Sequence, residues 1–180
     1  MKATGIVRRI DELGRVVIPK EIRRTQRIRQ GDPLEIFTTG EGEVIFKKYS
    51  PIGELSDFAA EYAAVLAKAL NRTAFLCDRD NIIAAAGTGR KELQDQRVAS
   101  ALEKRMEARR LFTATGQPEE NVFPCETSAR PVLVLAPIIA GGDVAGAVGL
   151  LAEERADMPA AEETKAAEIA AAFLAKQMEE

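Results

Sequence analysis

Histidine and tryptophan are absent from the 180 residues, and only two cysteines are present. Without histidine the chain cannot form an imidazole metal site, a histidine-based catalytic triad or a phosphohistidine. Cys77 and Cys125 are too few for a disulfide framework or for a four-ligand zinc site within one chain. We therefore expect reduced thiols, no metal, no cofactor and no catalytic residue.

The chain also lacks a long apolar run and a targeting segment. Its longest apolar stretch, residues 132–140, contains Pro137, and it is far shorter than the roughly 20 residues of a membrane-spanning helix. The N-terminus is polar and leads directly into a basic motif, so no secretory signal is predicted. These absences favour a cytoplasmic protein that does not associate with a membrane.

Charge is divided unevenly along the chain. Residues 1–50 contain 11 Lys and Arg against 7 Asp and Glu, whereas the remainder contains 14 and 21, so the two parts carry net charges of +4 and −7. A basic module joined to an acidic one is typical of a nucleic-acid binder with a separate regulatory domain, although small imbalances are also common. We predict one domain at 1–50, a linker at 51–55 and a second domain at 56–180.

The basic half is organised around the stretch Gly14–Lys20, GRVVIPK. Short apolar and β-branched segments on both sides of Gly14 predict strands, and Pro19 predicts the first turn of a helix. Glycine-containing turns then separate two further strands. The predicted strands cover 6–10, 14–18, 34–37 and 44–46. So small a domain cannot bury much apolar surface alone, which favours dimerisation.

These residues resemble the swapped-hairpin DNA-binding domain of AbrB-type transition-state regulators. The resemblance rests on an Arg-bearing strand, Asp11, the segment Leu13–Lys20, Arg23 and the Gly31-Asp32 turn, and it covers about the first fifty residues. It implies that two chains exchange hairpins to form one small β-barrel, a homodimer whose partner is double-stranded DNA.

Arginine suits DNA binding because its planar guanidinium can bond a guanine edge or a phosphate in two places. The resemblance implies DNA contacts for Arg8, Arg15, Arg23 and Arg24, followed by Arg9 and Lys20. Gly14 and Pro19 are assigned to backbone geometry. The alternative is a solvated basic face without a specific role.

The second half alternates helices and strands in an order that predicts an α+β domain with an antiparallel sheet and flanking helices. The predicted helices cover 54–70, 95–110 and 160–177, with Asn71 ending the first. The predicted strands cover 73–77, 82–86, 122–125, 132–139 and 144–151. This order resembles a GAF domain. The full length resembles sporulation regulators of the AbrB type that carry a C-terminal GAF domain, which implies activation of some genes and repression of others.

The GAF resemblance implies an unidentified small-molecule ligand between the sheet and its loops. The candidate ligand-binding residues are Phe75, Cys77, Ile82 and Gly87, with the segment 111–131 as a further wall. A few GAF domains reduce methionine sulfoxide with several cysteines, but two cysteines make catalysis an unfavoured alternative.

The last helix carries an alanine-rich apolar stripe. Its members are Ala167, Ala170, Ala171, Leu174 and Met178. The stripe either packs on the sheet or allows close helix–helix approach between chains, and the resemblance implies a tetramer joined through GAF-domain helices.

Two further functions remain open. The chain could be a ligand-binding GAF protein whose N-terminal barrel only dimerises it. It could also be an antitoxin-like DNA-binding protein, since antitoxins carry a similar barrel. Antitoxins usually continue into a short disordered tail, whereas this chain continues into a long segment with a clear apolar pattern.

Overall fold

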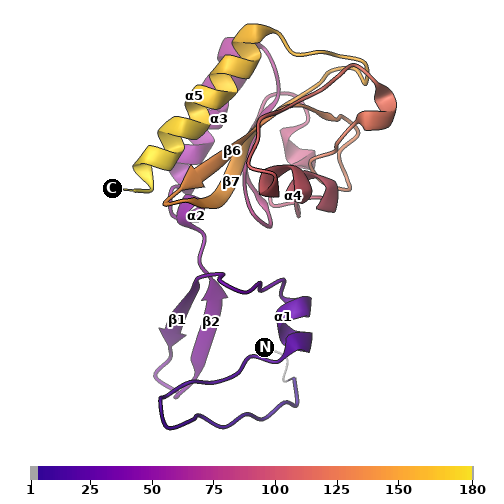
Figure 1. Ribbon diagram of the computed structural model, residues 1–180. Coiled ribbons are helices and arrows are strands. Elements are labelled where there is room, and N and C mark those ends of the chain that lie inside the picture. Colours follow the sequence, from indigo (N-terminus) through magenta and orange to yellow (C-terminus); the bar gives the residue numbers. More distant parts are fainter. Residues whose placement is uncertain (1–3, 180) are drawn as a thin grey trace. The chain divides into compact units, whose positions relative to one another are not determined.

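A computed structural model describes residues 4–179 and divides into two compact units between Tyr49 and Ser50 (Figure 1). The first unit contains helix α1 (Lys20–Thr25) and strands β1 (Leu34–Thr38) and β2 (Val44–Lys48). The two strands form an antiparallel hairpin in which Ile36 lies opposite Phe46. The predicted hairpin is therefore confirmed.

The predicted strands at 6–10 and 14–18 are wrong for the single chain, because the structure shows no strand among residues 4–19. The two segments meet only at a turn, where the Asp11 N–H donates to the Arg15 carbonyl at 3.0 Å. A strand needs a neighbour for its N–H and C=O groups, and residues 4–179 do not supply one here. Large apolar side chains are exposed here, including Val7, Ile10 and Val17.

Helix α1 begins after Pro19, which is buried. Pro19 was predicted at the first helical position, but it lies at the N-cap, one position before the first helical residue Lys20. Glu21 is in the first turn and Arg23 and Arg24 are in the last turn. This order of charges complements the helix dipole, and it favours the short helix.

The second unit contains a five-stranded antiparallel sheet in the order β4-β3-β7-β6-β5. The strands are β3 (Ala74–Asp78), β4 (Ile82–Ala86), β5 (Phe112–Thr113), β6 (Val132–Ala140) and β7 (Asp143–Leu151). Four of the predicted strands are confirmed to within one residue. The predicted strand at 122–125 is wrong, because this segment forms a loop, and the short β5 was not predicted.

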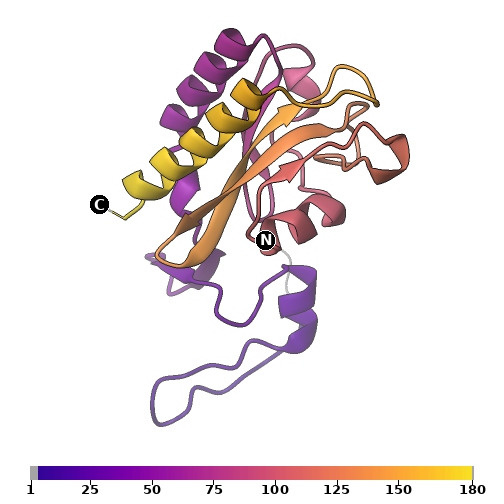
Figure 2. The same cartoon turned by 45° about the horizontal axis from the view of Figure 1, so that its top comes forward.

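Helices cover both faces of this sheet (Figures 1 and 2). Helices α2 (Pro51–Glu54), α3 (Ser56–Leu70) and α5 (Ala161–Gln177) cover one face, and α4 (Ser100–Glu107) covers the other. Residues 51–55 were expected to be a linker, but they form a helical turn whose Ile52 is fully buried in the core of the second unit.

The limits of the first and last predicted helices agree with the structure to within two residues, whereas those of the middle helix do not. Asn71 ends α3 in the left-handed conformation, with φ of 49°, and α5 begins one residue after its predicted start. The helix predicted from residue 95 begins only at Ser100. The preceding segment is held extended beside β4, because the Ile82 N–H donates to the Gln96 carbonyl at 2.8 Å.

The turn between β6 and β7 is bonded to residues just after the C-terminal ends of α4 and α5. The Arg109 guanidinium, just after α4, donates to the Gly142 carbonyl at 2.6 Å. The Gly141 N–H donates to the Glu179 carboxylate, just after α5, at 3.2 Å. One hairpin tip therefore connects the chain segments that follow helices on opposite faces of the sheet.

Candidate functional site

The turn at Asp11 fixes the position of Arg15 in the first unit. The Asp11 carboxylate accepts the N–H groups of Leu13 and Arg15 at 3.0 and 2.8 Å, and it accepts the Arg15 side-chain Nε at 2.8 Å. The bond from the Arg15 N–H, and then the bond from its side chain, lower the pKa of Asp11 below its ordinary value. Gly14 occupies the turn with φ of 75°, which suits glycine.

The six predicted DNA-binding cations all lie on the first unit. Arg8 and Arg9 are on the extended segment, Arg15 follows the turn, and Lys20, Arg23 and Arg24 are on α1. All are exposed except Arg23, which is half-buried. Within residues 4–179, Arg15 is the member of this set with an ion pair, so the other five cations remain available to phosphates.

The structure places three of the four predicted ligand-binding residues in the core of the second unit. Phe75, Cys77 and Ile82 are fully buried in the core between the sheet and α4. Gly87 has φ of 102°, and a Cβ there would lie 2.8 Å from Thr73 Cα. The structure therefore gives Gly87 a role in close backbone packing.

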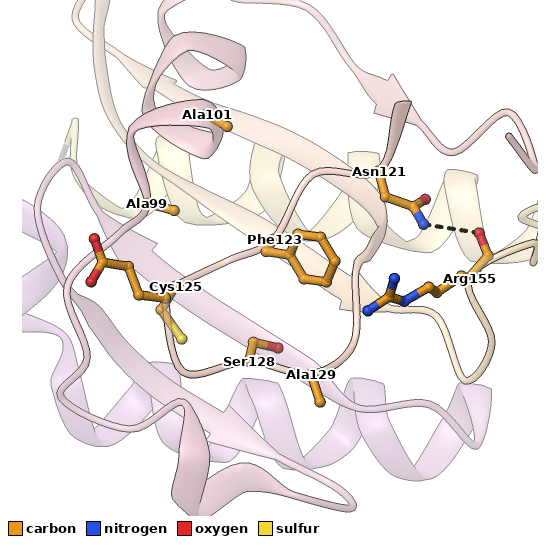
Figure 3. A pocket seen from close by; sticks show the side chains of 9 residues that line it. Ala99, Ala101, Asn121, Phe123, Cys125, Ser128, Ala129 and Arg155 are labelled. Carbon is orange, nitrogen blue, oxygen red and sulfur yellow. Dashed lines mark hydrogen bonds between the residues drawn. The ribbon is translucent and has the colours of Figure 1, made fainter. Parts of the chain in front are cut away.

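A groove of about 400 Å³ lies instead beside the loop that follows β5 (Figure 3). It is lined by Ala99 and Ala101 at the start of α4, by residues of the loop 121–129, and by Arg155 after β7. Part of the segment 111–131, predicted as a further wall, therefore does border a groove. Arg155 and Phe123 were not among the predicted site residues, and no sequence pattern marks either one.

Both cysteines are free and buried. Burial, followed by the nearby Asp78 charge, raises the pKa of the Cys77 thiol far above its ordinary value. Cys77 Sγ lies 3.6 Å from Met106 Sδ in the core. Cys125 is also buried, and its Sγ lies 3.3 Å from the Thr127 hydroxyl. The described residues hold no group of three metal-ligating side chains.

An exposed aromatic cluster joins α3 and α5. The Tyr62 and Phe173 rings stack with centroids 5.9 Å apart, and Phe58 lies 5.9 Å from Tyr62 and 6.0 Å from Phe173. Phe58, Phe173 and the nearby helical residues Val65 and Ile169 are exposed. By contrast, most of the alanine-rich stripe on α5 is buried in the core. The structure therefore supports packing of the stripe on the sheet and not a contact between chains.

Comparison with known proteins identifies the family. The family model described as stage V sporulation protein T C-terminal, transcription factor, matches residues 54–179. Stage V sporulation protein T of Bacillus subtilis (strain 168) is 48% identical over 180 residues, which are all of both chains. The chain belongs to this family of sporulation transcription factors. The predicted resemblance is thereby confirmed.

Each unit has further relatives. The transition state regulatory protein AbrB of Bacillus subtilis (strain 168) is 56% identical over 63 residues, 32% of this chain and 65% of that protein. The model of the MazE antitoxin family, described as antidote-toxin recognition, matches residues 7–53. The cofactor-binding GAF domain of the nutrient sensor CodY from Clostridium difficile matches with a TM-score of 0.51 at 13% identity, over 66% of this chain and 83% of that one. This last likeness shows that the second unit has a GAF fold.

None of the helices in the described part of the chain has both the length and the apolarity needed to cross a bilayer.

Proposed function

We propose that the chain regulates the transcription of sporulation genes, as activator and repressor, by binding double-stranded DNA through its first unit. The observation that carries this proposal is the identity of 48% over the whole length of stage V sporulation protein T. The chemistry of the first unit supports it, because five exposed or half-buried cations there have no ion pair among the described residues.

The DNA-binding unit is a dimer in this proposal. Residues 6–18 expose Val7, Ile10 and Val17 and leave an extended backbone without a sheet partner in the described chain. Pairing with the same segment of a second chain would satisfy the backbone groups and bury these side chains. Two chains that exchange hairpins in one shared β-barrel would pair these backbone groups and bury these side chains. Such a dimer would carry two copies of each cation.

Six residues form the proposed DNA-binding set: Arg8, Arg9, Arg15, Lys20, Arg23 and Arg24. Helix α1 holds three of them within two turns, and the Asp11 turn holds Arg15. Contacts to phosphates would set the position of the protein, and contacts to base edges would set sequence preference.

The second unit would join two dimers into a tetramer. The aromatic cluster of Phe58, Tyr62 and Phe173 is the proposed contact, together with Ile169. Exposed aromatic residues gathered on one face are typical of protein–protein interfaces. A tetramer carries two DNA-binding barrels, and their simultaneous engagement raises the apparent affinity.

The same proposal makes the protein cytoplasmic and not an enzyme. The raised pKa of the Cys77 thiol supports the second point, since a protonated thiol is a poor nucleophile. The GAF unit then serves assembly and the sensing of a small ligand.

An antitoxin-like function is the second candidate, because the MazE antitoxin model matches residues 7–53. It predicts a toxin partner that co-purifies with the chain. The folded GAF unit at 50–180, in place of a short tail, favours the regulator.

The test is the affinity of the full chain for sporulation-promoter DNA across a salt series. The expected plot of log K against log salt has a steep negative slope. Replacing Arg8, Arg23 and Arg24 by alanine should make the slope less negative by about one for each phosphate that the protein no longer neutralises. The control variant has Lys165 and Lys176 on α5 changed to alanine, which removes positive charge outside the first unit. Its plot of log K against log salt should keep the slope of the unchanged chain. Binding that does not depend on salt, or equal slopes for both variants, would refute the proposal.

A further inference from the structure

We propose that the groove beside Phe123 is an effector site for a small organic carboxylate with a flat or branched apolar body. This inference goes beyond DNA binding, and it places the ligand outside the buried core between the sheet and α4. The groove measures about 400 Å³, which lies within the range of small-molecule sites.

The walls of the groove are held in place before any ligand binds. The loop 121–129 lacks regular structure, but the Ala99 N–H donates to the Pro124 carbonyl at 2.9 Å, and the Val132 N–H donates to the Val122 carbonyl at 2.7 Å. The Thr127 hydroxyl donates to the Glu92 carbonyl at 3.0 Å. The loop is thus bonded to three other segments, which favours a preformed site.

Phe123 provides the apolar surface of the groove. Its neighbours Val122 and Pro124 are buried, whereas Phe123 is half-buried and projects into the groove (Figure 3). Ala99, Ala101 and Ala129 also line the groove with small side chains and leave room over the ring. A flat or branched apolar group would cover the ring and remove it from water.

Arg155 provides a cation with no acidic partner among the described residues. It lies in an acidic segment, but Glu153 and Asp157 pair with other arginines, and Glu154 is exposed and forms no ion pair among the described residues. Arg130 pairs with Glu153 at 3.1 Å, and Arg72 pairs with Asp157 at 3.1 Å.

The position of Arg155 is also fixed. The Asn121 side-chain amide donates to the Arg155 carbonyl at 3.1 Å, and the Arg155 guanidinium lies 5.8 Å from the centroid of the Phe123 ring. The hydrogen bond holds the backbone of Arg155, and the exposed guanidinium lies over the ring at the groove.

These two side chains together define the ligand class. A guanidinium binds a carboxylate through two parallel hydrogen bonds, and the adjacent ring accepts the apolar body. Glu126 also lines the groove and is exposed. Its negative charge disfavours a second anionic group on the ligand, so the site selects monoanions.

The test is calorimetric titration of the full chain with phenylacetate and isovalerate, each compared with its neutral amide. The chain should bind the carboxylates, and it should bind the amides on the order of tenfold more weakly, because the charge-assisted hydrogen bonds are absent. The variant Arg155→Gln should lower the affinity for each carboxylate to that of its amide. Arg110→Gln, which removes an exposed arginine of the same unit outside the groove lining, should leave it unchanged.

A second variant tests the apolar surface without removing it. Phe123→Leu should weaken phenylacetate more than isovalerate, because only the first ligand has a ring to stack. Equal carboxylate binding by Arg155→Gln and the unchanged chain would overturn the proposal. So would the absence of saturable binding by both carboxylates up to about 10 mM. Promoter binding of the same preparations without ligand is measured in parallel, so that failure of the effector site and failure of the DNA-binding proposal are separate results.

Discussion

The ring of Phe75 on β3 lies over Gly149 on β7, its direct cross-strand neighbour, in the space that a Cβ would occupy. The absence of a side chain on β7 lets the largest buried residue of the second unit lie flat on the sheet. Phe75, predicted as a ligand-binding residue, is thereby placed in the core, where it packs in the cluster with α4.

Gly149→Ala should destabilise the second unit by about 1–3 kcal/mol, because the new methyl group overlaps the Phe75 ring. Urea unfolding followed by circular dichroism measures this destabilisation. Phe75→Leu in the same background should recover part of it, so the double variant should be more stable than the sum of the single changes predicts. If the destabilisations of the two single variants add up to that of the double variant, the methyl group overlaps atoms other than those of the Phe75 ring.

Asp157→Asn should lower the stability of the second unit at neutral pH by about 1–2 kcal/mol. Burial tends to raise the pKa of Asp157, but N–H groups of Glu154 and Glu153 and the Arg72 side chain outweigh it, so the pKa is lowered. A lowered pKa in the folded state contributes stability above the unfolded value of about 3.9, and this stability is lost as the pH falls through the folded value.

The stability difference between Asp157→Asn and the unchanged chain should therefore disappear in acid. Unfolding free energies from pH 7 to pH 2, at about one-unit steps, measure it. Glu154→Gln is the control, because its carboxylate is exposed and forms no ion pair within the described residues. A difference that persists unchanged at the lowest pH would contradict the ionic origin of the effect.

Arg15→Ala should weaken promoter binding by about 1–3 kcal/mol, and unevenly across DNA sequences if Arg15 contacts a base edge. Competition titrations with a panel of promoter sequences measure this effect. A uniform effect across sequences would make Arg15 a phosphate contact.

Asp11→Ala tests whether the turn positions Arg15. It removes a negative charge, so electrostatics alone would strengthen DNA binding. Removal of the bonds from Asp11 to Leu13 and Arg15 should instead weaken it. Glu12→Ala removes the same charge from an exposed neighbour and should bind equally or more tightly. If both variants bind more tightly, the turn has no positioning role.

Phe173→Ser should convert the tetramer into dimers, because it removes the ring that contacts both Tyr62 and Phe58. Light scattering over a concentration series should show that the variant needs a protein concentration at least about tenfold higher to form tetramers. Glu168→Ser changes an exposed residue of the same helix and should not shift it. A dimeric mass for the unchanged chain would refute this mode of assembly.

The sequence predicted the sheet of the second unit well, because its strands are apolar runs bounded by clear turns. Residues 122–125 have the composition of a strand for the same reason, but Pro124 lacks an N–H, and Val122, Pro124 and Cys125 are bonded to three different segments. Residues 6–18 have the composition of strands but no strand partner in the described chain. Whether a partner is present depends on the other parts of the protein and on assembly, which the local sequence pattern does not reveal. One wall of the groove was predicted through the segment 111–131, but Arg155 was missed because it is far from that segment in sequence and belongs to no motif.

The hairpin tip at Gly141-Gly142 has a mechanical consequence. Arg109, which follows the groove-side helix α4, and Glu179, which follows α5 on the assembly side, are bonded to adjacent residues of one turn. A displacement of either helix end would therefore have to break its bond to this turn or move the turn with it. The tip is thus the one short piece of backbone through which these two bonds link the ends of helices on opposite faces of the sheet.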